Sequence, residues 1–75
     1  MIFKIEQFRA DLITKRVIER DISMDEAAKE IGVSKPTLSR IENRKLCDIE
    51  TFAKIVVWLN KSASDYFEAS ATNPF

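Results

Sequence analysis

The positively charged side chains that could bind an anion are concentrated in one short part of the chain. Residues 35–46 contain four basic residues and one acidic residue, whereas residues 1–34 contain six and seven, and residues 47–75 contain two and four. The net charge is therefore +3 in the central segment, −1 before it and −2 after it. Phosphate contact requires a local basic patch rather than a high overall charge. The central segment is a candidate phosphate-binding surface.

Residues that support catalysis or metal binding are scarce. The chain has no histidine, one glycine and one cysteine, Cys47, so it lacks a glycine-rich phosphate loop and a Cys/His ligand set. We predict no metal, no cofactor and no enzymatic activity. A lone thiol suits the reducing cytoplasm. The sequence has no run of roughly 20 apolar residues and its start is too charged for a secretory signal, so we expect a cytoplasmic protein outside the membrane.

The hydrophobic pattern predicts two helices before the basic segment. The first is amphipathic and spans about residues 5–19, with a row of apolar side chains formed by Phe8, Leu12, Ile13 and Val17. Ser23 and Glu26 have the spacing of a capping box, in which each side chain satisfies a backbone N–H of the other. A second helix is therefore expected over residues 24–31. Gly32 ends it, because glycine readily takes a left-handed conformation.

Three more helices are predicted after this turn. Ser34 caps the third, over residues 35–43, and Pro36 lies in its first turn, where the missing N–H costs nothing. Asp48 caps the fourth, whose apolar residues repeat every three or four positions, namely Ile49, Phe52, Ile55, Val56 and Leu59. Asn60 can take the left-handed stop position.

The last predicted helix is short. Ser62 or Ser64 caps it, it contains Tyr66 and Phe67, and residues 69–75 are expected to fray as a mobile tail. The prediction is an all-α fold, a compact bundle of five helices that forms one domain over residues 1–75.

Residues 23–43 have the dimensions of a helix-turn-helix unit. Two helices of about eight residues, joined by a turn that begins at glycine, form a unit whose second helix can enter a DNA major groove. Ala28 is small, so the two helices can cross closely. The pair would be held on the core by the apolar side chains of Ile31, Val33, Leu38 and Ile41.

The run from Ser23 to Asn43, followed by Arg44-Lys45 and residues 48–54, resembles the Cro and phage-repressor (XRE-like) type of helix-turn-helix family. The most specific part is Gly32-Val33-Ser34 followed by residues 37–43, and the resemblance covers residues from about 12 to 68. It implies five helices of the phage-repressor DNA-binding domain type, with the third in the major groove. It also implies a sequence-specific transcriptional regulator, with repression the expected effect, that binds a near-palindromic operator as a homodimer.

The resemblance also implies roles for individual residues. Those carried over to the base-reading face are Lys35, Pro36, Thr37, Ser39 and Arg40. Arg40 is the best candidate, because its guanidinium matches the O6 and N7 acceptors of guanine. Those expected to hold the phosphate backbone, by side chains or free N–H groups, are Ser23, Met24, Ser34, Asn43, Arg44 and Lys45.

Glu42 would be repelled by phosphate, so an internal role is expected for it. We predict that it pairs with Arg16 or Lys15 and braces the third helix. Two residues depart from the family pattern. Met24 stands where many members have a glutamine that can bond to DNA, so that contact is lost or replaced by packing. Arg44 stands where glycine is common, so either the helix stop is strained or the third helix ends differently.

A protein-binding module remains the alternative function. Small domains of this family can act as antitoxins that hold a toxin, and Tyr66 and Phe67 are candidates for a partner surface, whereas Trp58 is expected in the core. Dimerisation is expected because one recognition helix contacts too few base pairs for specificity. The interface is expected in the fifth helix, the tail or residues 1–3, and a weak interface would form a dimer only on DNA.

Overall fold

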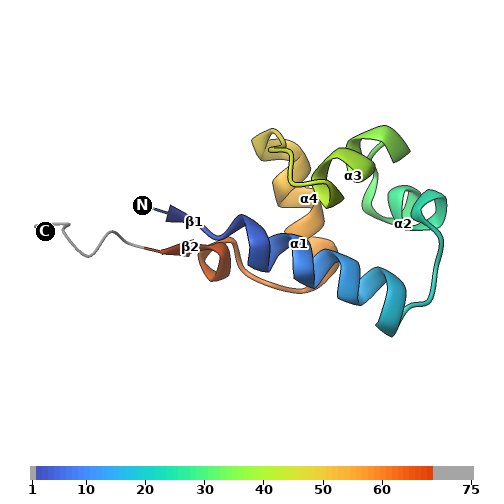
Figure 1. Cartoon of the computed structure of the whole chain (residues 1–75), viewed down its shortest axis with the longest axis horizontal. Helices are drawn as coiled ribbons and strands as arrows, with labels where there is room; N and C mark the ends of the chain where they lie inside the picture. The colour runs from blue at the N-terminus through green and yellow to red at the C-terminus, as the bar shows by residue number, and fades with distance from the viewer. Residues whose placement is uncertain (1, 69–75) are drawn as a thin grey trace, which may run out of the picture.

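The computed structural model describes residues 2–68, which fold as helices closed by a small sheet (Figure 1). The elements in chain order are β1 (Ile2–Phe3), α1 (Ile5–Ile13), η1 (Thr14–Glu19), α2 (Met24–Ile31), α3 (Lys35–Glu42), α4 (Ile49–Leu59), η2 (Ala63–Tyr66) and β2 (Phe67–Glu68). The described residues thus contain four α-helices, so the mostly helical prediction is confirmed and the count of five is not. No helix within residues 2–68 is long and apolar enough to cross a membrane.

The first helix changes its winding halfway. After α1 the chain continues as η1, a π-helical segment, and the Arg20 N–H donates to the Lys15 carbonyl, five residues earlier, at 2.8 Å. Phe8 and Leu12 are buried, but Val17 is 46% exposed. The prediction that Val17 shares their face is wrong, because nine residues from Phe8 amount to about two and a half turns of an α-helix.

The predicted helix starts and stops are present. Ser23, Ser34 and Asp48 each accept the backbone N–H of the residue three positions on, at 3.2, 3.3 and 3.3 Å. For Ser23 this is the serine half of the expected capping box. Gly32 (φ 93°) and Asn60 (φ 59°) take the left-handed conformation that ends α2 and α4. These local signals fix where each helix begins and ends.

The core lies where α2 and α3 cross over α1 and α4 (Figure 1). Ala27 and Ala28 are buried on α2, and their small side chains let α3 approach closely. The other fully enclosed side chains come from α1, α3, α4 and η2, and they are Phe8, Leu12, Leu38, Ile41, Ile55 and Tyr66. Ile49, predicted for the buried stripe of α4, is instead 77% exposed.

The C-terminal end differs from the predicted fifth helix. Ser62 caps η2, a single 3-10 turn with a reciprocal Ser62–Asp65 capping box, and Phe67 then enters β2. β2 pairs antiparallel with β1, so that Ile2 lies opposite Glu68 and Phe3 opposite Phe67. The Phe3 and Phe67 rings stack with centroids 5.3 Å apart. Burial of these rings favours an extended chain over a helix here. The expected mobile tail, residues 69–75, lies outside the described residues.

Candidate nucleic-acid interface

Helix α3 has one buried face and one face open to solvent. Leu38 and Ile41 are 0% and 2% exposed and hold the helix on the core. Of the five predicted base-reading residues, Lys35, Pro36 and Arg40 are exposed, whereas Thr37 and Ser39 are half-buried. The outward face of α3 therefore offers two cations separated by about one and a half helical turns.

The N-terminal end of α3 is organised by hydroxyl groups. Ser34 caps the helix, and its Oγ also lies 2.7 Å from Thr37 Oγ1. Arg40 Nη2 donates to the same Thr37 oxygen at 3.4 Å. These bonds occupy Thr37 and orient the Arg40 side chain along the helix toward its N-terminus. Arg40 therefore stands on the open face of α3, beside Thr37.

The start of α2 lies beside the start of α3. Lys35 Nζ on α3 is 3.6 Å from Asp25 Oδ2 on α2, and both side chains are more than half exposed. Ser23 is exposed, whereas the side chain of Met24 packs against the core. The structure therefore agrees with packing as the replacement for the glutamine contact, and only the backbone N–H of Met24 is left for an anion.

Beyond α3 the chain makes the turn that the sequence left open. Asn43 Nδ2 donates to the Ser39 carbonyl at 2.8 Å, and Arg44 takes the left-handed conformation with φ 66°. A non-glycine residue therefore occupies the strained stop. Arg44 Nε also donates to Glu6 at 2.8 and 3.2 Å, with its side chain 64% exposed. Arg44 and the exposed Lys45 follow directly from the open face of α3.

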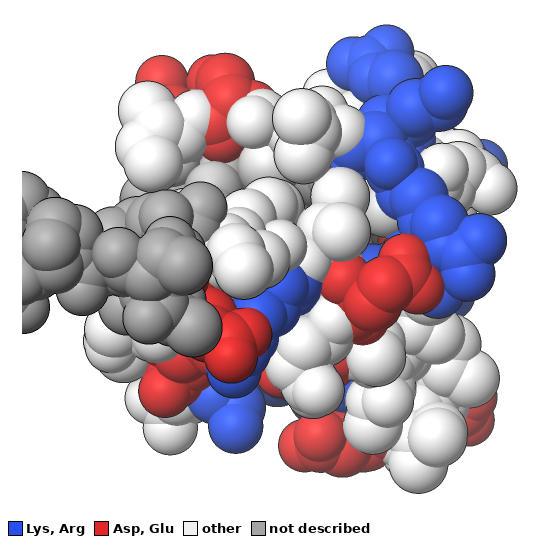
Figure 2. Space-filling view, turned by 60° about the vertical axis from the view of Figure 1, so that its left-hand side comes forward, with Lys and Arg blue, Asp and Glu red and all other residues white. Residues whose placement is uncertain are grey.

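The basic residues of the central segment form a basic face, which we define as Lys35, Arg40, Arg44 and Lys45. The Lys45 N–H donates to the Arg40 carbonyl at 2.9 Å, so the loop after α3 folds back on the helix. In Figure 2 a group of Lys and Arg side chains forms a run along the upper right edge of the molecule, with carboxylates beside it, while other Lys and Arg side chains lie apart from this run. A duplex laid on this edge would meet an excess of positive charge.

Glu42 lies on the inner side of α3 and binds helix α1–η1. Its carboxylate accepts from Arg16 Nε at 2.7 Å and from Arg16 Nη2 at 2.8 Å. The side chains of Arg16 and Glu42 are only 16% and 9% exposed, and this hydrogen bonding raises the pKa of Arg16 above its ordinary value. The predicted pair with Arg16 is thus present. The alternative partner, Lys15, lies instead over the Trp58 ring, 4.9 Å from its centroid.

A second arginine, Arg9, also contacts Glu42 and was not predicted from the sequence. We call Arg9, Arg16 and Glu42 the brace. Arg9 Nε donates to the Glu42 carbonyl at 2.6 Å, so the last residue of α3 is held by two arginines. Arg9 and Arg16 are seven residues apart, about two helical turns, so they project from nearly the same side of one helix. That spacing is the signal that could have identified Arg9.

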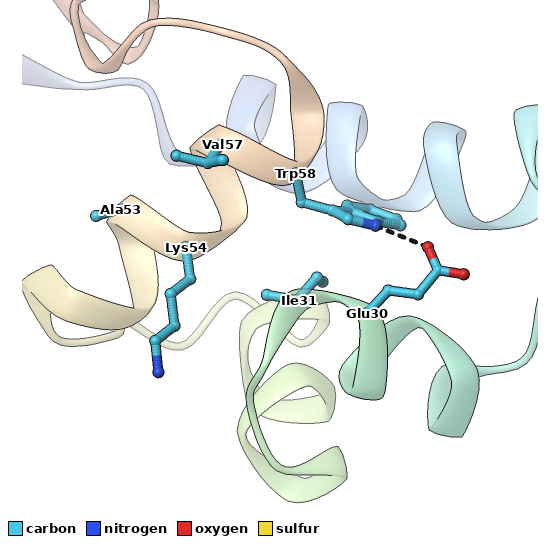
Figure 3. Close-up of a pocket in the computed structure, with 6 residues that line it drawn as sticks. All are labelled: Glu30, Ile31, Ala53, Lys54, Val57 and Trp58. Atoms are coloured by element: carbon cyan, nitrogen blue, oxygen red, sulfur yellow. Dashed lines mark hydrogen bonds between the residues drawn. The ribbon is translucent and has the colours of Figure 1, made fainter.

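A groove between α2 and α4 lies outside the basic face (Figure 3). It encloses about 430 Å³ and is lined by Glu30, Ile31, Ala53, Lys54, Val57 and Trp58. Trp58 is half-buried rather than fully in the core, and its Nε1 donates to Glu30 at 3.1 Å. Hydrogen bonds from Trp58 and then from Arg20 lower the pKa of Glu30. The groove lining is mostly apolar, with Glu30 and Lys54 as its charged members.

Tyr66 does not offer a partner surface. Its ring is 1% exposed, and its hydroxyl donates to Asp11 Oδ2 at 2.7 Å. The prediction of a partner contact through Tyr66 is wrong, because the ring fills the core between α1 and α4. Within residues 2–68, no group of three or more His, Cys, Asp or Glu side chains could hold a metal ion.

Comparison with known proteins agrees with this geometry. A family model described as helix-turn-helix matches residues 12–65, more than half of the 75-residue chain. A search of curated proteins and a search of solved structures gave no match. The matched region contains α2, the Gly32 turn and α3, together with the Arg16–Glu42 pair. The chain belongs to the phage-repressor (XRE) type of helix-turn-helix family, whose domains are those of DNA-binding regulators.

Proposed function

We propose that this protein is a small transcriptional repressor that binds double-stranded DNA sequence-specifically, with α3 in the major groove. The proposal places Lys35, Pro36, Thr37, Ser39 and Arg40 toward base edges. It assigns the phosphate backbone to Ser23, Met24, Ser34, Asn43, Arg44 and Lys45. The DNA is a near-palindromic operator, and two copies of the chain bind it.

The division of α3 into two faces carries the proposal. Leu38 and Ile41 fix one face on the core, while Arg40 stands on the other with its side chain bonded to Thr37. A guanidinium held on a rigid helix can donate two hydrogen bonds to guanine O6 and N7. Half-buried Thr37 and Ser39 offer short contacts beside it. Pro36, which has no donor, is suited to a thymine methyl group.

The residues around α3 support a phosphate-binding role. Within the basic face, Arg44 and Lys45 lie beyond the C-terminal end of α3. At the other end, Lys35 contacts Asp25 in the first turn of α2, which Ser23 caps. Positive side chains and free helix N–H groups attract phosphate without reading sequence. The exposed pairs that Lys35 and Arg44 form with carboxylates are weak, so phosphate can replace those partners.

The proposal of two copies and of repression is supported by this mode of binding. A single recognition helix reads only a few base pairs, so specificity requires a second copy about one helical turn away on the duplex. A protein seated in the major groove excludes other proteins from the same site. Repression therefore needs no surface beyond those already described.

Selection from a random duplex library tests the proposal. The wild type is expected to enrich a near-palindrome whose half-sites are about 10 base pairs apart. Arg40→Ala should lose about 1–3 kcal/mol of binding free energy and relax the preference at one position of each half-site. Lys61→Ala is the charge-matched control, because Lys61 is an exposed cation beyond the C-terminal end of α4.

Lys61→Ala should enrich the same sequence as the wild type. Enrichment of no sequence by the wild type would contradict the proposed function. An unchanged preference for Arg40→Ala would remove Arg40 as the reader and leave the rest of the proposal intact.

The groove in Figure 3 favours one second candidate, an antitoxin that holds a toxin. Val57, which lines it, is 78% exposed, so an apolar side chain beside the groove is open to a partner. Under this reading, co-expressed wild type and Arg40→Ala both relieve the growth inhibition caused by a toxin encoded beside this chain, and Val57→Gln does not. Relief by Val57→Gln would exclude the groove as the toxin site.

A further inference from the structure

Exposed apolar side chains lie directly after the basic face. Leu46, in the loop between α3 and α4, is 75% exposed, and Ile49, the first residue of α4, is 77% exposed. Ile49 also lines a hollow of about 220 Å³, together with Phe3, Cys47, Phe52 and Phe67. We call Leu46, Ile49 and this hollow the loop patch. Figure 2 looks toward the end of the molecule that carries β1 and β2, and the hollow lies at that end.

The loop patch is built on an ordered part of the fold. Asp48 caps α4 through the Thr51 N–H. Hydrogen bonding with the Thr51 side chain, and to a smaller extent with this N–H, lowers the pKa of Asp48. Cys47 and Phe52 occupy the positions of a hydrophobic staple, before the cap and one turn into the helix, and both line the hollow. Ile49 is therefore held pointing outward by a fixed helix start.

We propose that a second copy of this chain covers the loop patch when two copies occupy one operator. The inference rests on the proposed function and identifies the partner surface that this function requires. It moves the expected interface from a fifth helix or the tail to the connection between α3 and α4, with Phe3 of the N-terminal segment at its edge. The two recognition helices would then be joined through their C-terminal ends.

The order of residues in the loop patch makes it complementary to itself. Lys45 precedes Leu46, and Glu50 follows Ile49, so a positive and a negative side chain flank the exposed apolar pair. A two-fold axis places the same surface against itself in the opposite direction. Lys45, which the proposed function places at the phosphate backbone, then also lies near the partner subunit's Glu50, while Leu46 projects toward the partner's hollow. An isologous contact of this kind closes after two copies.

The size and position of the loop patch indicate when the contact forms. Its exposed apolar surface is on the order of a few hundred Å², below the roughly 800 Å² per partner of a stable interface. Two copies would therefore remain apart in solution. The loop patch is also continuous with the basic face through Arg44 and Lys45, so copies on adjacent half-sites meet at high effective concentration. The contact thus appears as cooperativity on DNA.

The test compares the full-length wild type with Ile49→Gln and Val57→Gln. Val57 is the matched control, because it lies on the same helix, is 78% exposed and lines the other groove. Glutamine is uncharged, so neither change alters the attraction to phosphate. All three proteins should bind a duplex with one half-site equally. On two half-sites the wild type and Val57→Gln should show a cooperative gain in the range of about 5–150-fold, and Ile49→Gln should lose it.

Cooperativity retained by Ile49→Gln, or lost equally by Val57→Gln, would overturn the inference. If the wild type binds all duplex sequences equally, the proposed function fails. The side-chain NMR signals of Ile49 then test whether two copies still meet through the loop patch. Signals of Ile49 that shift with protein concentration, while those of Val57 do not, support this contact, and constant signals overturn it. A shift of Ile49 that depends only on removal of residues 69–75 would identify that segment as the occupant and overturn the inference as well.

Discussion

At the scale of single residues, Glu42 is the side chain that ties the end of α3 to α1 and η1. It ends α3, receives two hydrogen bonds from Arg16 and accepts one from Arg9 at its carbonyl. Because the pair is mostly shielded from water, each charge depends on the other for hydrogen bonds. Loss of one partner would free the C-terminal end of the recognition helix.

Glu42→Gln should therefore lower the free energy of unfolding by about 2 kcal/mol. The loss is smaller than for a fully buried pair, since Arg16 can turn toward water. Glu50→Gln is the control: the Glu50–Lys54 pair is exposed with atoms 3.4 Å apart, and its loss should cost less than about 0.5 kcal/mol. Urea unfolding of both variants measures the difference, and equal losses would contradict the role of the brace.

Tyr66 makes the stability depend on pH at the alkaline end. Burial, followed by the hydrogen bond to Asp11, raises the pKa of Tyr66 above its ordinary value of 10.0. The folded state therefore keeps the phenol proton where the unfolded state loses it, so stability is full below pH 10.0 and falls as the pH rises above it.

Tyr66 is the one tyrosine of the chain, so ultraviolet absorbance reports its ionisation without ambiguity. Tyrosinate should appear well above pH 10.0 in the folded protein and near pH 10.0 in denaturant. The same titration midpoint in both states would show that the hydroxyl is not held as described.

At the scale of elements, the turn after α3 combines strain with function. Arg44 adopts φ 66° and pairs with Glu6 across to α1, an exposed contact of little energy. Glycine at this position removes the steric cost of the left-handed conformation. The present sequence retains a cation instead.

Arg44→Gly should raise the free energy of unfolding by about 0.5–1 kcal/mol, because a left-handed non-glycine residue costs at least that much. The same change should weaken operator binding and reduce the slope of log affinity against log salt by about 1. Gly32→Ala is the opposite control: φ is 93° and an added Cβ meets nothing within 4 Å, so only backbone strain is introduced and stability should fall. Lower stability of Arg44→Gly would show that the Glu6 pair outweighs the strain.

Helix boundaries and the recognition unit could be predicted from the sequence because their signals are local. Ser34, Asp48 and Asn60 each fix a helix end through contacts within a few residues. Arg16 and Glu42 could be paired because an acid beside the surface proposed to bind phosphate was expected to need an internal cation. In each of these cases one chemical requirement, a cap for a helix end or a partner for a charge, was enough to identify the residue.

The errors fall where distant segments decide the structure. Two-residue strands carry no periodicity, so the pairing of Phe3 with Phe67, and with it the loss of the fifth helix, was not visible. The outward position of Ile49 was missed because its spacing matches that of the buried residues of α4. Whether the first residue of α4 is buried depends on the path of the loop before the helix, which the spacing of residues within α4 does not predict.

At the scale of the whole molecule, charge and apolar surface divide the protein into regions with different tasks. The chain is neutral overall, yet its basic face is confined to α3 and the loop after it. The loop patch adjoins this face, whereas the α2–α4 groove lies outside it. A neutral protein with one basic edge can bind DNA in one orientation, which is the requirement for reading a sequence.

The most direct test of the central claim, that Arg40 reads guanine in the major groove, replaces atoms of the DNA. In the selected operator, the guanine assigned to Arg40 is changed to 7-deazaguanine, which lacks the N7 acceptor, or to inosine, which lacks the minor-groove amino group. The account predicts that 7-deazaguanine costs the wild type about 1 kcal/mol or more and costs Arg40→Ala nothing further, while inosine affects neither protein. Equal loss in both proteins, or sensitivity to inosine alone, would contradict it.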